Sequence, residues 1–157
     1  MFNATEIVQM NKQNTLASWM AQGGWNPIPI DHAEGVYIYD ANGKRYLDWS
    51  SQLVNVNIGH SHPHVVKAIQ DQVAKLCYVE PSFASEPRGR LGELLAEVTP
   101  GNLSKAFFTN GGTDAVENAM KIARLYTGKQ KIFTRYKSYH GATFASMSAG
   151  GDPRRLA

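Results

Sequence analysis

The sequence has a single cysteine, Cys77, so no intrachain disulfide can form. This scarcity fits a reducing compartment, where thiols stay free. Cys77 follows Val73 and Leu76 in an apolar pattern with helical spacing. We therefore expect a structural thiol at this position and not a nucleophile.

Long apolar runs are also absent. No stretch approaches the roughly 20 apolar residues that a membrane-spanning helix needs. A secretory signal peptide has a basic segment that leads into an apolar core. Residues 1–13 lack this pattern. We therefore expect no membrane contact and a soluble, cytoplasmic protein.

Charge of one sign is not concentrated anywhere in the chain. The 16 Lys and Arg residues against 13 Asp and Glu residues give a net charge of +3, and the basic residues are scattered. A nucleic-acid-binding surface needs a basic cluster or stripe, so we expect no nucleic-acid partner. The hydrophobic content of 43% suffices for one ordinary globular domain, and no repeat or low-complexity linker interrupts it.

What the first third of the chain does contain is a turn signal between two β-prone runs. The runs 36–39 and 45–48 flank Asn42-Gly43, a pair that supplies the positive φ values of a tight hairpin turn. The sequence therefore predicts a β-hairpin here. Residues 5–20 upstream carry a weak helical pattern, and we expect them to form an arm outside the core.

The rest of the chain alternates helices and strands. Apolar residues at helical spacing follow Pro63 and again Pro87, and each proline lies near the start of its helix. Next come an expected strand over 105–109, a helix over 114–126 that Gly128 caps, and a strand over 131–135. This order predicts a right-handed crossover in a largely parallel sheet, so the expected fold class is α/β.

A glycine-rich turn, Asn110-Gly111-Gly112-Thr113, leads from the first of these strands into the helix. Free backbone N–H groups collect at a helix start and bind anions, and glycines let the backbone approach a phosphate closely. Tyr139-His140 follow the next strand and so lie at the same carboxyl edge of the sheet. Together they suggest a seat for a flat, phosphorylated cofactor. The alternative is that Asn110 and Thr113 only cap the helix.

Four motifs follow one another in a fixed order along the chain. They cover residues 35–48, 57–63, 83–87 and 107–115. Together they resemble the N-terminal hairpin, the Asn-x-Gly-His-x-His-Pro element and the next two signatures of class III, pyridoxal-phosphate-dependent aminotransferases of the ω-amino-acid group. Many relatives carry serine and glutamate where this chain has Gly111 and Asp114, so one side-chain hydroxyl to the phosphate is lost.

The resemblance implies fold type I of the pyridoxal-phosphate (PLP)-dependent transferases, of which this chain is a truncated N-terminal part. An N-terminal arm and β-hairpin segment would cover residues 1–60. The first part of the large PLP-binding α/β domain, with its mostly parallel sheet, would cover residues 61–157. Finer similarity through residues 51–57 and 151–155 is to taurine and 4-aminobutyrate aminotransferases.

The resemblance also assigns residues to the cofactor and the substrate. The implied cofactor contacts are a phosphate cup of Gly111, Gly112 and Thr113, a ring-stacking Tyr139, and His140 beside it. Leu53 and Val54 fall where relatives line the substrate pocket, although an inward-facing strand pair explains them equally well.

The activity implied by the family is transfer of an amino group from a small-molecule amine to a 2-oxo acid, in an enzyme expected to be a homodimer. The family's Schiff-base lysine and the carboxylate that keeps the ring nitrogen protonated come from later strands. None of the lysines between positions 105 and 137 lies in a matching motif. We therefore expect no catalytic residue in this chain, both groups beyond position 157, and no transamination by this fragment alone.

Other functions compete with this interpretation. His60, His62 and His64 could gather around zinc, but no acidic or thiol ligand accompanies them in a zinc pattern, so we expect no metal site. An aminomutase or decarboxylase of the same fold would share the cup. A non-catalytic module that binds a phosphorylated ligand, or that pairs with a complementing chain, is also open. A dinucleotide-binding domain ranks last because Gly111-Gly112 lacks the Gly-x-Gly-x-x-Gly spacing.

Overall fold

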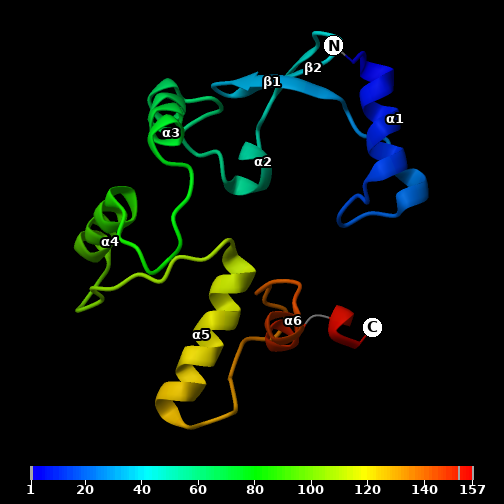
Figure 1. Cartoon of the computed structure of the whole chain (residues 1–157). Helices are drawn as coiled ribbons and strands as arrows, with labels where there is room; N and C mark the ends of the chain where they lie inside the picture. The colour runs from blue at the N-terminus through cyan, green and yellow to red at the C-terminus, as the bar shows by residue number, and fades with distance from the viewer. Residues whose placement is uncertain (1, 152, 157) are drawn as a thin grey trace. The chain divides into compact units, whose positions relative to one another are not determined.

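The computed structural model describes residues 2–151 and 153–156. The chain forms two compact units that meet in the sequence at Glu80 and Pro81. The first unit holds α1 to α3 and the strands, and the second holds α4 to α6 (Figure 1). Among the described residues, no helix is long and apolar enough to cross a membrane.

Helix α1 spans Ala4–Asn14 and begins with a reciprocal cap. Asn3 Oδ1 accepts from the Glu6 N–H (3.0 Å), and Glu6 Oε2 accepts from the Asn3 N–H (2.8 Å). This arrangement satisfies two donors at the helix start. The helix ends sooner than the sequence pattern predicts because Thr15 adopts extended backbone and donates both its N–H and its hydroxyl to the carbonyl four residues back. A 3-10 turn, η1, follows over Gln22–Gly24.

The sheet of the first unit is antiparallel, with strand order β1-β2-β3. The strands are β1 (Ile30–Glu34), β2 (Tyr37–Asp40) and β3 (Arg45–Leu47). Strands β2 and β3 pair with Ile38 opposite Tyr46, so the predicted hairpin is confirmed. Strand β1 was not predicted because its sequence, Ile-Asp-His-Ala-Glu, has little β propensity after the first residue.

The hairpin turn is one residue longer than the Asn42-Gly43 pair predicts. The Asp40 N–H donates to the Lys44 carbonyl (3.0 Å) and the Gly43 N–H donates to the Asp40 carbonyl (2.9 Å), which leaves three residues in the loop. The positive φ, 80°, falls on Gly43. Asp40 Oδ1 accepts from the N–H groups of Lys44 and Asn42 (2.9 Å each), and Oδ2 accepts from the Tyr46 hydroxyl (2.9 Å). These bonds lower the pKa of Asp40, and the hydrogen bond from the Lys44 N–H contributes most.

Helix α3 spans Pro63–Lys75, with the proline in its first turn as predicted. It ends two residues before Cys77, because Leu76 adopts extended backbone. Cys77 is exposed, and its Sγ contacts the Val73 carbonyl oxygen (3.2 Å). Cys77 therefore lies outside the helix in which the apolar pattern predicts it.

A two-bond bridge ties the hairpin to the segment before α3. The Gly35 N–H donates to the His60 carbonyl (3.0 Å), and the His60 N–H donates to the Gly35 carbonyl (2.7 Å). Gly59 has a φ of 90°, and a Cβ there would lie 3.2 Å from the Gly35 oxygen. The Ser61 hydroxyl donates to the Ala33 carbonyl (2.6 Å). The backbone around His60 is therefore fixed to the sheet.

The second unit is helical. Its elements are α4 (Glu86–Val98), α5 (Gly112–Thr127), α6 (Phe144–Gly150) and the 3-10 turn η2 (Pro153–Leu156). The predicted helices after Pro87 and over 114–126 are confirmed as α4 and α5. Gly128 closes α5 in the left-handed region (φ 68°), and its N–H donates to the Arg124 carbonyl (2.9 Å).

The predicted strands over 105–109 and 131–135 do not form in this structure. Both segments run without ladder pairing, and among the described residues the sheet contains β1, β2 and β3 alone. A strand is stabilised by hydrogen bonds to a neighbour, and neither segment has one here. Phe133 is accordingly 94% exposed. The α/β class holds, but the parallel sheet expected at its centre is not assembled within the described chain.

Candidate cofactor site

The start of α5 is open to an anion. The residue before its first turn is Gly111, which has extended backbone and no side chain, and no side-chain hydrogen bond caps this helix within the described chain. Neither Asn110 nor Thr113 therefore acts as the cap. A Cβ built on Gly111 or Gly112 would meet no atom within 4 Å, and both glycines are exposed. The first-turn N–H groups can therefore donate to a phosphate.

The structure brings the two halves of the predicted site together through Thr113 and Gly141. Gly141 has a φ of 133° and is buried. A Cβ there would lie 2.3 Å from Thr113 Oγ1 and 2.8 Å from Thr113 Cβ, so only glycine fits against this threonine. Gly141 therefore packs beside the start of α5, and it joins the candidate site as a residue that the sequence analysis did not predict.

Tyr139 keeps most of its ring in solvent, with 61% of the residue exposed. The Arg154 guanidinium lies over this ring, 5.8 Å from its centroid. His140 is half-buried. An exposed aromatic face two residues from Gly141 is what a ring-stacking role requires.

Glu117 fastens α6 to α5 and was also not predicted. Its Oε1 accepts from the Ser146 N–H (2.9 Å), the Ala145 N–H (3.1 Å) and the Thr143 hydroxyl. The Thr143 bond, followed by the Ser146 bond, lowers the pKa of Glu117 below its ordinary value. The available sequence signal was its position four residues after Thr113, which puts both side chains on one face of a helix.

Leu53 and Val54 do not form a strand pair. They belong to α2, a single turn over Ser51–Val54, and their residues are 67% and 75% exposed. Ser51, Gln52 and Val54 have φ values of 53°, 57° and 59°. Positive φ is costly for residues other than glycine, most of all for a β-branched valine, and persists only where the surroundings enforce it.

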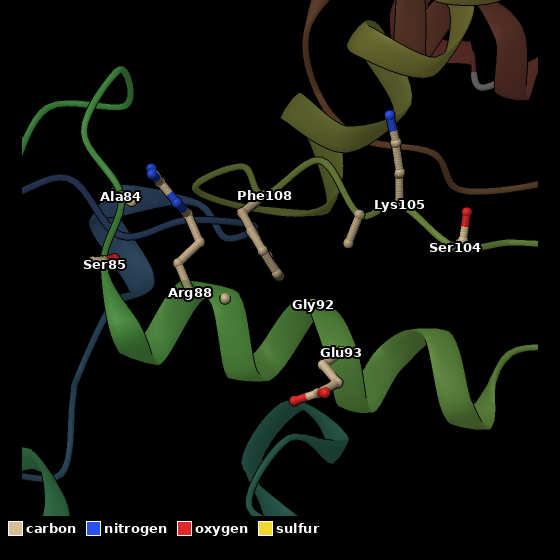
Figure 2. A pocket seen from close by; sticks show the side chains of 10 residues that line it. Ala84, Ser85, Arg88, Gly92, Glu93, Ser104, Lys105 and Phe108 are labelled. Carbon is tan, nitrogen blue, oxygen red and sulfur yellow. The ribbon is translucent and has the colours of Figure 1, made fainter.

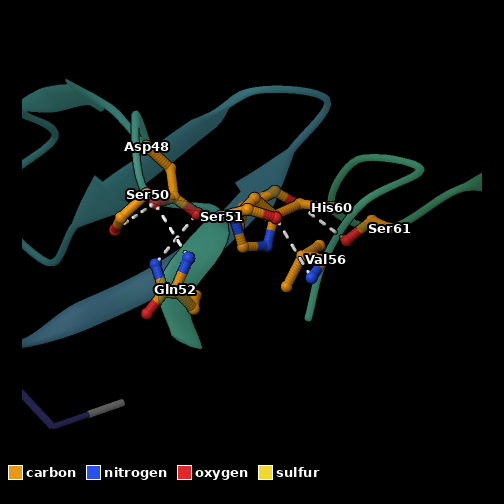
Figure 3. Close-up of polar contacts among 8 residues, drawn as sticks. Asp48, Ser50, Ser51, Gln52, Val56, His60 and Ser61 are labelled. Carbon is orange, nitrogen blue, oxygen red and sulfur yellow. Dashed lines mark hydrogen bonds and ion pairs between the residues drawn. The ribbon is translucent and has the colours of Figure 1, made fainter. Parts of the chain in front are cut away.

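Hydrogen bonds to Asp48 hold the α2 turn in this conformation, as Figure 3 shows. It accepts from the Gln52 N–H on Oδ1 (3.1 Å) and from the Gln52 side-chain amide on Oδ2 (3.0 Å), and Oδ2 also bonds His60 Nε2 (2.7 Å). The Ser51 hydroxyl accepts from the Val56 N–H (3.1 Å). The bonds from the side chain and backbone of Gln52, followed by His60, lower the pKa of Asp48 to about 2. This carboxylate, with its side chain 5% exposed, is therefore a fixed anchor for the α2 turn.

The histidine cluster does not gather around one point in the structure. His60 is engaged with Asp48, and among the described residues no group of three or more His, Cys, Asp or Glu side chains is arranged to hold a metal ion.

A separate pocket of about 470 Å³ lies between α4 and residues 104–108. In Figure 2 the Phe108 side chain points toward α4 near Gly92. Gly89 also lines the pocket. Arg88 and Lys105 also line this pocket. None of the residues predicted for cofactor or substrate lies in its wall.

Comparison with known proteins places the sequence among aminotransferases. The profile of the family described as aminotransferase class-III matches residues 19–156. An isoleucine 2-epimerase from Lentilactobacillus buchneri is 38% identical over 90% of this chain and 32% of its own length. An acetylornithine aminotransferase from Listeria innocua is 41% identical over 82% of this chain and 33% of its own length.

Solved structures agree. A taurine:2-oxoglutarate aminotransferase from Bifidobacterium kashiwanohense, in complex with PLP and glutamate, is 42% identical with a TM-score of 0.93, over 99% of this chain and 35% of that one. The chain thus spans about a third of the length of the relatives it matches. From the extent of the family match, the chain belongs to the class-III aminotransferases and represents their N-terminal part.

Proposed function

We propose that the parent protein is a PLP-dependent aminotransferase that moves an amino group from an ω-amino compound, such as taurine or 4-aminobutyrate, to a 2-oxo acid. The observation that carries the proposal is the approach of Gly141 to Thr113 at the open start of α5, because the exposed Tyr139 lies two residues before Gly141 in the sequence. The taurine:2-oxoglutarate enzyme, with its bound PLP and glutamate, supports the choice of donor and acceptor.

The residues present suit the cofactor. Backbone N–H groups of Gly112 and Thr113 would hold the phosphate, with Gly111 leaving room for it. Tyr139 would stack on the ring, a contact that adds about 0.5–1.5 kcal/mol beyond burial, and His140 would shape the pocket beside it. When bound, PLP supplies an electron sink for chemistry at the amino-bearing carbon. Asp114 lies in the first turn of α5, where an acidic side chain is favourable to the helix dipole.

The remaining assignments concern the parent enzyme. Leu53 and Val54 would contact the substrate, and residues 1–60 and 61–157 would form the arm with its hairpin and the first part of the large domain. The catalytic lysine and the carboxylate for the ring nitrogen would come from other parts of the parent, a cytoplasmic homodimer. The 157-residue chain alone would then bind the cofactor without transaminating.

A second candidate is a different reaction on the same cofactor seat. The 38% identity to an isoleucine 2-epimerase favours an epimerase as the alternative, because such an enzyme would need the same cup and stacking ring. An aminomutase or decarboxylase would share them for the same reason.

The first experiment is a PLP titration of the purified chain, followed by absorbance, before and after borohydride reduction. Binding that inorganic phosphate competes away, without a reducible adduct at a specific lysine, is the expected result. A specific lysine adduct found by mass spectrometry would overturn the assignment of the lysine to another part of the parent. Absence of binding by both the chain and its parent would overturn the cofactor seat itself.

The second experiment separates the reactions. The parent protein is given taurine, 4-aminobutyrate and L-isoleucine, each with and without 2-oxoglutarate. Amino transfer that requires the 2-oxo acid supports the aminotransferase. Inversion of L-isoleucine at its α-carbon, without net amino transfer, supports the epimerase.

A further inference from the structure

The face of α5 on which the Thr113 side chain lies also carries Glu117. Thr113 and Glu117 are four residues apart, which places them one helical turn apart on the same side of the helix. Thr113 meets Gly141 at the position of the missing Cβ, and Glu117 meets the start of α6. One face of α5 therefore touches the 138–151 segment at two points.

The contact of Glu117 with α6 is concentrated on one atom. All three donors, from Thr143, Ala145 and Ser146, bond to Oε1. Ser146 is fully buried, and its hydroxyl accepts from the Thr143 N–H (3.2 Å), so the donors are themselves held in place. Bonds to an ionised carboxylate are stronger than bonds between neutral groups.

The other end of the segment is anchored by α6 as well. The Ser138 N–H donates to the Gly150 carbonyl (3.2 Å), and a Cβ on Gly150 would lie 2.1 Å from the Ser138 oxygen. The residues between Ser138 and Thr143 are therefore fixed at both ends. Tyr139 lies within this span.

We propose that Glu117 is a positioning residue for the cofactor seat: through α6 it holds the loop that bears Tyr139 against the phosphate cup. The inference rests on the proposed function, since it concerns how that seat is assembled. Glu117 acts through other residues and does not touch the cofactor. The bonds from Thr143, Ser146 and Ala145 lower the pKa of Glu117 below its ordinary value, as expected where the ionised carboxylate is the acceptor.

A positioning role predicts a difference between two ligands. Inorganic phosphate needs the cup alone, whereas PLP also needs the tyrosine ring in register with it. Loss of the Glu117 bonds should therefore weaken PLP binding more than phosphate binding. A role in folding alone would weaken both equally.

The test compares Glu117→Ala, Glu117→Gln and Glu97→Ala in the parent protein, with PLP and inorganic phosphate as probes. Glu97 is the matched control, an exposed glutamate on α4. We expect Glu117→Ala to raise the Kd for PLP about tenfold and that for phosphate less than about twofold, given the loss of charge-assisted bonds. Glu117→Gln should stay within about threefold of the parent, because its amide oxygen can accept the same three bonds. Glu97→Ala should leave both constants unchanged.

Hydrogen exchange gives a second measurement that does not depend on the ligand. The Ala145 and Ser146 amides should exchange faster in Glu117→Ala and regain most of their protection in Glu117→Gln. Equal PLP affinity in Glu117→Ala and the parent, or equal weakening of PLP and phosphate, would overturn the inference while leaving the proposed function intact. A parent protein that binds no PLP would overturn the proposed function, and the inference with it.

Discussion

At the residue scale, Gly141 meets a requirement for glycine that the local sequence pattern does not indicate. Its sequence neighbours Tyr139 and His140 were predicted beside the cup because they follow an extended segment. The need for glycine itself arises from Thr113, which approaches it from a different part of the chain. Contacts of this kind have no signature in spacing or composition. The sequence indicates the two segments of the candidate site, and the fit between them is visible only in the structure.

Gly141→Ala should destabilise the second unit. The new methyl group would lie 2.3 Å from Thr113 Oγ1 and 2.7 Å from Ser146 Oγ, on a backbone with φ 133° that alanine adopts poorly. A loss of about 1–3 kcal/mol is expected from such strain. Denaturant unfolding of the parent protein, followed by far-UV circular dichroism, measures it.

Gly89→Ala is the matched control for this change. Gly89 lies inside α4, and a Cβ there would meet no atom within 4 Å. It should stabilise the protein by about 0.5–1 kcal/mol, because alanine favours a helix interior over glycine. Equal effects of the two substitutions would show that the Thr113 contact does not constrain position 141.

Asp48 makes the stability of the first unit depend on pH in the acidic range. Its pKa is about 2 in the folded chain against an ordinary value of 3.8. A lowered folded pKa means that the stabilisation is fully present above about pH 4 and is lost as the pH falls through about 2. Asp48→Asn should reduce the loss of stability in acid, of which the lowered pKa values of Asp40 and Glu117 cause a further part, and also loosen the α2 turn.

Urea unfolding of the parent protein at a series of pH values checks this expectation. Asp71→Asn is the control, since that carboxylate is exposed and pairs with Lys67 on the surface of α3. The wild type and the control should lose stability in parallel between about pH 4 and pH 2. The same slope in Asp48→Asn would mean that Asp48 is not the group responsible.

At the element scale, helices were predicted more accurately than strands. A helix carries its signals within itself: α3 and α4 each have a proline in the first turn, and a glycine caps the end of α5. A strand depends on a partner. The hairpin was predictable because β2 and β3 are partners separated by one turn, whereas 105–109 and 131–135 have no pairing within the described chain. Strand β1 was missed because its pairing with β2, and not its composition, makes it a strand.

Gly128→Ala should shorten α5 at its C-terminal end. Gly128 has a φ of 68°, in the left-handed region where a Cβ costs roughly 1–2 kcal/mol. Gly128→Asn should cost less, because asparagine tolerates this backbone. Hydrogen exchange of the Gly128 amide, which bonds to the Arg124 carbonyl, reports on the helix end. Equal protection in all three proteins would contradict the assignment of Gly128 as the cap.

At the scale of the whole chain, the two units bury little apolar surface. Among the described residues, Met120 is the one hydrophobic side chain that is almost fully buried, at 8% exposed. Phe133 and Phe144, at 94% and 89%, lie in solvent. In the similar structures this segment is about a third of the chain, so the rest of such a protein is the natural source of the missing contacts. Helix α5 and the hairpin are positioned by local bonds, while the core is not complete.

The isolated 157-residue chain should therefore associate in solution. Exposed apolar patches of this extent are typical of interfaces, and obligate dimers often have no stable folded monomer. Light scattering after size exclusion should give a mass above the 17.3 kDa of the monomer. This mass should increase with protein concentration. Phe133→Ser should reduce the association, whereas Lys129→Ser, a change at an exposed residue of the same loop, should not. A monodisperse monomer with a cooperative melting transition would show that the two units are stable on their own. The expectation that the isolated chain associates would then be wrong.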